Sequence, residues 1–439
     1  MANEALAPAI VPVRADFATR IAETGFVILL LLIIVGLQPF DTRTPAVIAA
    51  KNAASAAGDW VRQVAFLGTF ALIAFAAFRK RGVMALTAMP VMMILLLTWC
   101  LASAVWGDEP DVIARRAVLA AIFVASMMMS VDTLGTERTL ALWRGVMAAV
   151  ILLDIASCLV IHNAVHQSDD VEAALAGSWR GLHSHKNAAG SVAATAAAMF
   201  LYFWLETRRR SDLLLFVASV FFLVMTRSKS SLGLLPVAIM GGYLYRLVWR
   251  NQLDRAIAAT AAALLFLVFA VAVTVEWDFL ARILEDPQNF TGRAAIWQAE
   301  LAYVHDHPLL GAGFGTFGNT GTRSPIYDYV GPGWVSQIGE GHNGYLETLV
   351  TIGVIGCLLS VIAVIAVPFF QFWSAKRSDA PLNAFLFTLF VFNTLHNFME
   401  SDFINVTSAQ WGQMLLIVAL LKVSGRETDE RQRQLEWRR

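Results

Sequence analysis

The sequence predicts an all-α polytopic membrane protein with about twelve transmembrane helices. Of its 439 residues, 57% are hydrophobic and only 15% are charged, and the mean hydropathy is +0.61. This composition is too apolar for an ordinary soluble protein. The apolar residues gather in stretches close to the roughly 20 residues that a helix needs to cross a bilayer. The short alternating segments of a membrane β-barrel are not seen, so a helical bundle is expected.

The apolar stretches follow one another along the whole chain. No internal repeat is evident, so residues 1–439 are expected to form a single integral membrane domain. A large loop at 277–342 is inserted between the ninth and tenth helices. The expected helices occupy residues 24–40, 60–78, 84–106, 112–130, 139–162, 187–205, 212–226, 231–249, 255–276, 343–371, 382–404 and 406–424.

The charges of the short connections predict the orientation of these helices. Basic clusters fall on one side, which is cytoplasmic under the positive-inside rule. Both termini share that side, and the loops 163–186 and 277–342 then lie outside. The first 23 residues carry charges and no cleavage site, so the first helix is expected to remain as an anchor. The basic clusters are Arg79-Lys80-Arg81, Arg208-Arg209-Arg210, Arg246 with Arg250 and Arg255, Lys376-Arg377 and the tail after Lys422.

Net charge and cysteine content exclude several classes of protein. The formal net charge of +0 leaves no global basic field, so nucleic acid is not an expected partner. The three cysteines lie inside apolar stretches, and no Cys/His spacing of a metal site occurs. We therefore expect neither a bound metal nor a cofactor.

The large outer loop carries the first candidate residues. A chain made mostly of membrane helices rarely keeps a loop of about 65 residues unless the loop has a function. It opens with Thr291-Gly292-Arg293. Arginine offers a planar fork of donors that suits phosphate oxygens. An amphipathic helix lying on the membrane is expected to begin at Arg293, with Trp297 at the interface.

His342 is the sharpest candidate for a catalytic base. Imidazole titrates near neutrality, so it can accept a proton from an attacking hydroxyl. His342 lies where the loop re-enters the membrane, and Asn343 follows at an expected helix start. The alternative is a buried structural histidine capped by Asn343. Glu347, in the same segment, is a candidate for positioning the substrate.

A cationic patch ends the other outer loop. Arg180, His185 and Lys186 come just before or at the start of an expected helix, with Asn187 next. A helix N-terminus carries a positive partial charge, so this patch is expected to favour phosphate. The alternative is an interfacial anchor, because basic residues gather at lipid headgroups.

Two further cations, Arg227 and Lys229, lie in the connection between two expected helices, on the outer side. They depart from the positive-inside rule, and charge beside a helical bundle is costly unless it is paired or used. We expect them to bind substrate, with Arg227 the stronger candidate. The alternative is a pair of side chains that snorkel to lipid phosphates.

Polar residues also mark the outer end of the expected helix 382–404. They are His396, Asn397, Glu400 and Asp402. At a spacing of i, i+4, His396 and Glu400 would share one helix face. Ionisable groups inside a membrane are functional by default, although a packed ion pair explains them equally well.

Three blocks of these residues resemble the O-antigen ligase and Wzy-type polymerase superfamily, bacterial enzymes that transfer lipid-linked oligosaccharides. A fourth block is similar to its exopolysaccharide polymerase branch. The three blocks are Arg227; Thr291-Gly292-Arg293 with Trp297 and His307-Pro308-Leu309-Leu310-Gly311-x-Gly313; and His342-Asn343 with Leu346-Glu347 and Gly353. The fourth is Gly181-Leu182-His183-Ser184-His185-Lys186-Asn187.

The resemblance implies a glycosyltransferase-C-like fold in the bacterial inner membrane, with a periplasmic active site. It implies an undecaprenyl-diphosphate-linked oligosaccharide donor and essential roles for Arg227, Arg293 and His342. A glycan or lipid A–core is the implied acceptor, membrane lipid surrounds the protein, and a chain-length regulator is a further expected partner. No Asp-x-Asp motif occurs, so the diphosphate is expected to be held by arginine and not by metal.

Other functions remain open from sequence alone. A polymerase would extend a lipid-linked glycan, whereas a ligase would transfer the glycan to lipid A–core, and the acceptor pocket is not visible in the sequence. A lipid-linked oligosaccharide flippase also has about twelve helices, but transporters place their charges near the membrane centre within repeated halves. A purely structural scaffold is the last alternative.

Overall fold

The computed structural model describes residues 16–47, 58–248, 253–254, 256–257, 260, 264, 293–318, 324–331, 335, 340–375 and 380–437. Within these ranges the chain is helical, and the only β pairing is an isolated bridge between Val165 and Trp179. The all-α prediction is confirmed for this part of the chain. Most of the expected helix 255–276 lies outside the described residues, as does the start of the large loop.

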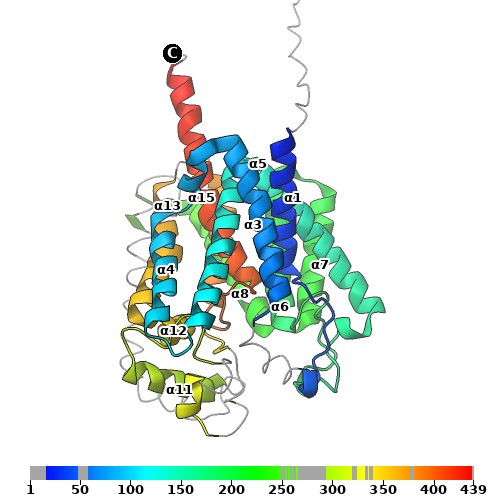
Figure 1. Ribbon diagram of the computed structural model, residues 1–439. Coiled ribbons are helices and arrows are strands. Elements are labelled where there is room, and N and C mark those ends of the chain that lie inside the picture. Colours follow the sequence, from blue (N-terminus) through cyan, green and yellow to red (C-terminus); the bar gives the residue numbers. More distant parts are fainter. Residues whose placement is uncertain are drawn as a thin grey trace, which may run out of the picture.

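The helices form one bundle (Figure 1). The C-terminus of α15 lies at the top of this view and α11 at the bottom. We call these two ends the tail face and the loop face. The main helices are α1 (Phe17–Ile34), α3 (Trp60–Arg81), α4 (Val91–Ala102), α5 (Pro110–Val160), α6 (Lys186–Thr207), α7 (Arg210–Thr226), α8 (Lys229–Val248), α11 (Arg293–Asp306), α12 (Gly344–Val361), α13 (Val367–Ser374), α14 (Ala380–His396) and α15 (Ala409–Trp437).

Six segments of the described chain are long and apolar enough to cross a membrane, where the sequence predicts twelve spans. Two more apolar helices are shorter, Val91–Val105 and Ala380–His396. The multi-pass membrane class is therefore supported, and the number twelve stays a prediction. The six segments are Phe17–Ile34, Trp60–Ala88, Pro110–Val160, Lys186–Thr207, Lys229–Val248 and Gly344–Ser374.

The longest helix, α5, consists of two legs. A straight helix of its 51 residues would be about 76 Å long, more than twice the thickness of a bilayer core. Gly135, with φ 76° and ψ 173°, interrupts it, and the next helical turn starts where Glu427 of α15 accepts a hydrogen bond from the Thr136 amide. This break falls between the two helices that the sequence predicts at 112–130 and 139–162.

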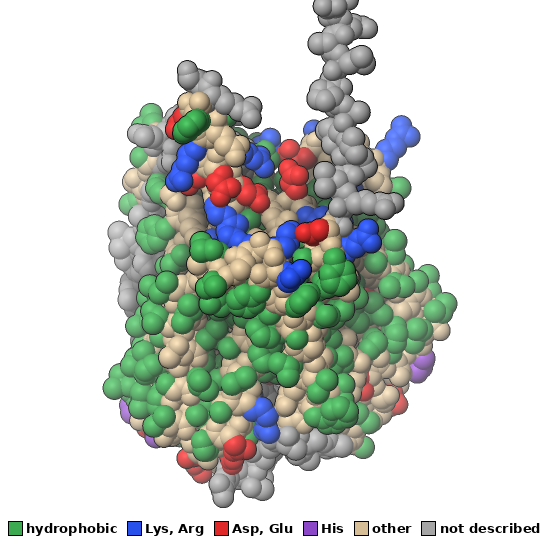
Figure 2. Space-filling view, turned by 45° about the horizontal axis from the view of Figure 1, so that its top comes forward, with side chains coloured by type: hydrophobic (Ala, Val, Ile, Leu, Met, Phe, Trp, Pro, Cys, Tyr) green, Lys and Arg blue, Asp and Glu red, His purple; other side chains and the backbone are tan. Residues whose placement is uncertain are grey.

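The outer surface separates apolar from charged side chains. Figure 2 shows a wide belt of hydrophobic side chains, with Lys, Arg, Asp and Glu gathered at the tail face. Large apolar side chains on the outside of the described helices, such as Leu67, Phe75 and Leu214, are about half exposed or more. Continuous exposed apolar surface of this kind is unfavourable in water and favourable against lipid. At the tail face, Arg81 and Arg426 both pair with Asp132.

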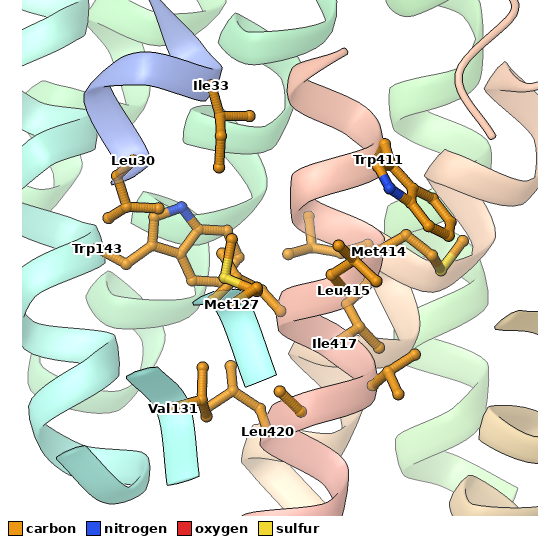
Figure 3. Close-up of a cluster of buried hydrophobic side chains, with 14 of the residues drawn as sticks. Leu30, Ile33, Met127, Val131, Trp143, Trp411, Met414, Leu415, Ile417 and Leu420 are labelled. Carbon is orange, nitrogen blue, oxygen red and sulfur yellow. The ribbon is translucent and has the colours of Figure 1, made fainter. Parts of the chain in front are cut away.

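The core lies where α1, α5 and α15 meet (Figure 3). Met127, Val131 and Trp143 of α5 are fully buried there, and Leu415 and Leu420 of α15 pack in the same cluster. Helix α6 is buried over twelve consecutive residues, as is expected of a helix in the middle of a bundle. This central helix begins at the loop face, at Lys186.

The motif at 308–313 binds to α12 where that helix is interrupted. Gly353 interrupts α12 with φ 67°, a region that favours glycine, and a Cβ there would lie 2.0 Å from the carbonyl oxygen of Leu309. The backbone of the motif takes over the interrupted bonds: Ala312 and Gly313 donate to the carbonyls of Val350 and Thr351 at 2.9 and 2.8 Å. This part of the large loop is thereby fixed to α12 near Gly353.

One expected helix ends early. The sequence predicts a helix through residue 404, with His396 and Glu400 on one face, but α14 ends at His396. Asn397 turns the chain, because its side-chain oxygen accepts hydrogen bonds from the amides of Asp402 and Phe403, at 3.1 Å each. Such side-chain bonds compete with the helical ladder. The prediction that His396 and Glu400 share a helix face was therefore wrong. Glu400 lies in a turn at the loop face.

Candidate active site

Glu400 joins three of the predicted site residues at the loop face. Its Oε2 lies 3.0 Å from Nδ1 of His342, and its Oε1 accepts a hydrogen bond of 2.8 Å from Arg293. The same Oε1 accepts a second bond of 2.8 Å from Asn187 of α6. Residues far apart in the sequence thus meet on one carboxylate.

Charge pairing sets the protonation of this cluster. Burial would raise the pKa of Glu400, but the hydrogen bond and charge of His342, with the charge of Arg293, lower it to about 2. Burial would lower the pKa of His342, but the hydrogen bond and charge of Glu400 outweigh it and raise that pKa. A carboxylate that accepts a hydrogen bond from Nδ1 leaves Nε2 free to take a proton.

His342 is held in an uncommon backbone conformation. Its φ is 53°, in the left-handed region that non-glycine residues seldom adopt. Asn343 follows as the N-cap of α12 and accepts hydrogen bonds from the amides of Tyr345 and Leu346. The His342 side chain is still 36% exposed. Strained backbone at an accessible polar residue is a common feature of functional sites.

Arg293 is the first residue of α11, where the sequence predicts a helix to begin. Its guanidinium also donates to the carbonyl of Met399, so two of its five N–H donors are used within the protein. Trp297 does not lie at a membrane interface, as the sequence suggested. It is 9% exposed, packs in a small core beneath α11, and donates to the carbonyl of Gly341 at 2.9 Å. Thr291 and Gly292 lie outside the described residues.

A group of cations lies next to Asn187, the residue of α6 that bonds to Glu400. Lys186, the first residue of α6, donates through Nζ to the carbonyl of Arg227 at 3.2 Å. Lys229 and Arg227 lie close enough to Lys186 for their charges to repel it. Arg227 caps α7 with φ 53° and is exposed, and no protein partner holds its guanidinium within the described ranges. The three residues thus form one cationic cluster, and their role in binding substrate stays a prediction.

Two predicted residues serve the local structure. Arg180 is 1% exposed and donates to the carbonyls of Asp41 and Ser184 at 2.6 and 3.2 Å. His185 is the N-cap of α6: its Nδ1 accepts from the Asn187 amide at 3.2 Å, and its Nε2 faces Glu172 at 3.4 Å. Neither bonds to Glu400. Their roles in substrate binding stay predictions.

The structure places the predicted residue Glu347 away from Glu400 and adds Glu300, which sequence reasoning passed over. Glu347 does not reach toward Glu400, because its Oε2 accepts a hydrogen bond of 2.9 Å from the Gly341 amide. Glu300 of α11 lies on the other side of Gly341 and is 1% exposed. Glu300 could have been noticed as a single carboxylate inside an apolar helical pattern. Nothing in the sequence indicated that it lies against Gly341.

Comparison with known protein families matches one part of the chain. A family model described as O-antigen ligase matches residues 214–361. None of the curated proteins matches the chain. The matched segment runs from α7 to the end of α12 and contains Arg227, Arg293 and His342, whereas Asn187 and Glu400 lie outside it. The match covers less than half of the chain, and it supports the resemblance to the superfamily of O-antigen ligases and Wzy-type polymerases.

Proposed function

We propose that the protein is a glycosyltransferase of the bacterial inner membrane that polymerises oligosaccharide repeat units from undecaprenyl-diphosphate donors at the periplasmic face. The observation that carries this proposal is the meeting of His342 and Arg293 on Glu400. Asn187, which also bonds to Glu400, follows Lys186, and Lys186 bonds to the backbone of Arg227. A base and a set of cations on one accessible face suit transfer from an anionic leaving group.

In the proposed step, the acceptor hydroxyl attacks the anomeric carbon of the donor sugar. The bond from this carbon to the diphosphate oxygen breaks, and undecaprenyl diphosphate leaves with the electron pair. The hydroxyl proton passes to Nε2 of His342, while Glu400 orients the ring through Nδ1, as carboxylates do in catalytic triads. A single displacement inverts the anomeric configuration, so a product with retained configuration would contradict this step.

The cations would bind the diphosphate and stabilise the charge that develops on it. In this proposal, Arg227, Lys186 and Lys229 would contact the diphosphate from one cluster, and Arg293 of α11 would contribute a further cation. Arginine binds two phosphate oxygens at once, which suits a diphosphate. Since the chain has no Asp-x-Asp motif, we propose that the reaction needs no metal.

A polymerase is favoured over a ligase by the block at 181–187. This block resembles exopolysaccharide polymerases, and its last residue, Asn187, bonds directly to Glu400. The alternative activity, transfer of the glycan to lipid A–core, uses the same base and the same donor. The two differ only in the acceptor.

The acceptor can be identified with purified protein in nanodiscs. The donor is the lipid-linked oligosaccharide extracted from cells of the source organism that lack this gene, and products are resolved on a gel. A ladder from donor alone supports a polymerase, and product only with added lipid A–core supports a ligase. No product with either acceptor, from a donor verified by mass spectrometry, would contradict both and favour a flippase.

A further inference from the structure

One face of α11 reaches the active site at three points. Arg293, Trp297 and Glu300 follow a spacing of i, i+4 and i+7, which places them on the same side of the helix. Arg293 bonds to Glu400, and Trp297 bonds to the Gly341 carbonyl. Glu300 lies against Gly341 itself: a Cβ built on Gly341 would lie 1.9 Å from its Oε1.

Gly341 is therefore in contact with three side chains. Its carbonyl accepts from Trp297, its amide donates to Glu347 of α12 at 2.9 Å, and the Glu300 carboxyl fills the position of its missing side chain. The next residue is His342, with its left-handed backbone. The orientation of the His342 ring thus depends on how Gly341 is held.

We propose that Glu300, together with Glu347, is a positioning residue that fixes Gly341 and so directs His342 toward the acceptor hydroxyl. This inference rests on the proposed function, since it assigns the two carboxyls to the orientation of its base. Neither carboxyl would touch the substrate.

Burial and charge indicate how Glu300 acts. Its Oε2 has no hydrogen-bond partner in the part of the chain that the structure describes. Burial first, and the nearby charge of Glu347 second, raise its pKa well above the ordinary range. A neutral carboxylic acid packs against Gly341 at low cost, whereas a second carboxylate beside Glu347 would repel it. Glu340, His342 and Arg116 are the other charged groups near this pair.

Substituted proteins separate positioning from general destabilisation. In the nanodisc transfer assay with the extracted donor, Glu300→Ala should lower kcat about 10- to 100-fold and leave KM within about twofold. Glu300→Gln, which mimics the neutral acid, should restore kcat to within about threefold of the native value. Its activity should also fall less than that of native protein as the pH rises, because residue 300 no longer carries a carboxyl that can ionise beside Glu347. Ala302→Gln, on the exposed side of α11, is the control.

Each outcome bears on the proposal. Native kcat in Glu300→Ala, or a pH profile of Glu300→Gln identical to that of native protein, would overturn it. If Glu300→Ala does not fold, as judged by size-exclusion chromatography, the pH profile of Glu300→Gln decides alone. His342→Ala is assayed beside them: if it keeps native activity, the proposed function fails, and if it is inactive while both Glu300 variants behave as native, only the positioning role fails.

Discussion

Nδ1 of His342 lies 3.0 Å from Oε2 of Glu400, although 58 residues separate them in the chain. Glu400 is also paired with Arg293, so one carboxylate fixes the proposed base and one of the proposed diphosphate ligands. Loss of its charge should therefore affect both proton transfer and donor binding.

Glu400→Gln keeps the size of the side chain and removes its charge. The amide cannot stabilise an imidazolium, and it favours the wrong ring tautomer, so we expect kcat to fall by about 10² or more. The measurement is the initial rate of transfer in nanodiscs. Glu206→Gln, the same change at the tail-face end of α6, should leave the rate within about twofold. Equal rates for both variants would contradict a role for Glu400.

The pH dependence of the rate reports on His342. The ring must be neutral to accept a proton, and Glu400 raises its pKa above the ordinary value of 6.5. Activity should therefore fall as the pH decreases through a midpoint above 6.5. In Glu400→Gln the midpoint should move to lower pH, because the charge that favours the imidazolium is gone. A midpoint that does not move would show that another group titrates.

Arg227 tests the diphosphate site, since its guanidinium is free of protein partners within the described residues. Loss of a charged hydrogen bond costs about 1.5–3 kcal/mol, so Arg227→Ala should reduce kcat/KM by about 10- to 150-fold. Inorganic pyrophosphate should inhibit native protein and inhibit this variant more weakly. Arg246→Ala, which removes an exposed arginine at the tail-face end of α8, is the control. Equal inhibition of all three proteins would place the diphosphate elsewhere.

Substitution of Asn343 tests whether the N-cap of α12 holds His342 in place. As the N-cap of α12 it bonds to two amides, and loss of such a cap costs about 1 kcal/mol. Asn343→Ala should lower the Tm in detergent and lower kcat, because the cap adjoins His342. Asn343→Ser keeps a capping oxygen and should restore most of both losses. If Ser and Ala behave alike, the cap is not what holds the histidine.

Much of this arrangement could be predicted from the sequence. Hydropathy indicates where the helices lie, and polar residues among them indicate where a site lies. Apolar length located α6 and α8 to within a few residues, and the positions of charges singled out Arg227, Arg293 and His342 in the connections at the loop face. The end of α14 was missed because apolar residues such as Phe398 and Phe403 continue past it, while Asn397 turns the chain with side-chain bonds.

The pairings within the site were beyond prediction from sequence. Glu400 was chosen as a candidate for its place on a helix face, yet it contacts His342 from a turn. Trp297 was expected at the membrane because its amphipathic helix had no known partner, and the structure supplies one in Gly341. Such contacts depend on how distant segments meet, and local patterns in the chain do not carry that information.

The most direct test of the central claim is the rate of a single round of transfer by His342→Ala, with the extracted lipid-linked donor at saturating concentration. The account predicts a rate about 10²–10⁴ below that of native protein, with donor binding retained, because only the proton acceptor is lost. A native rate in this variant would contradict the assignment of His342 as the base.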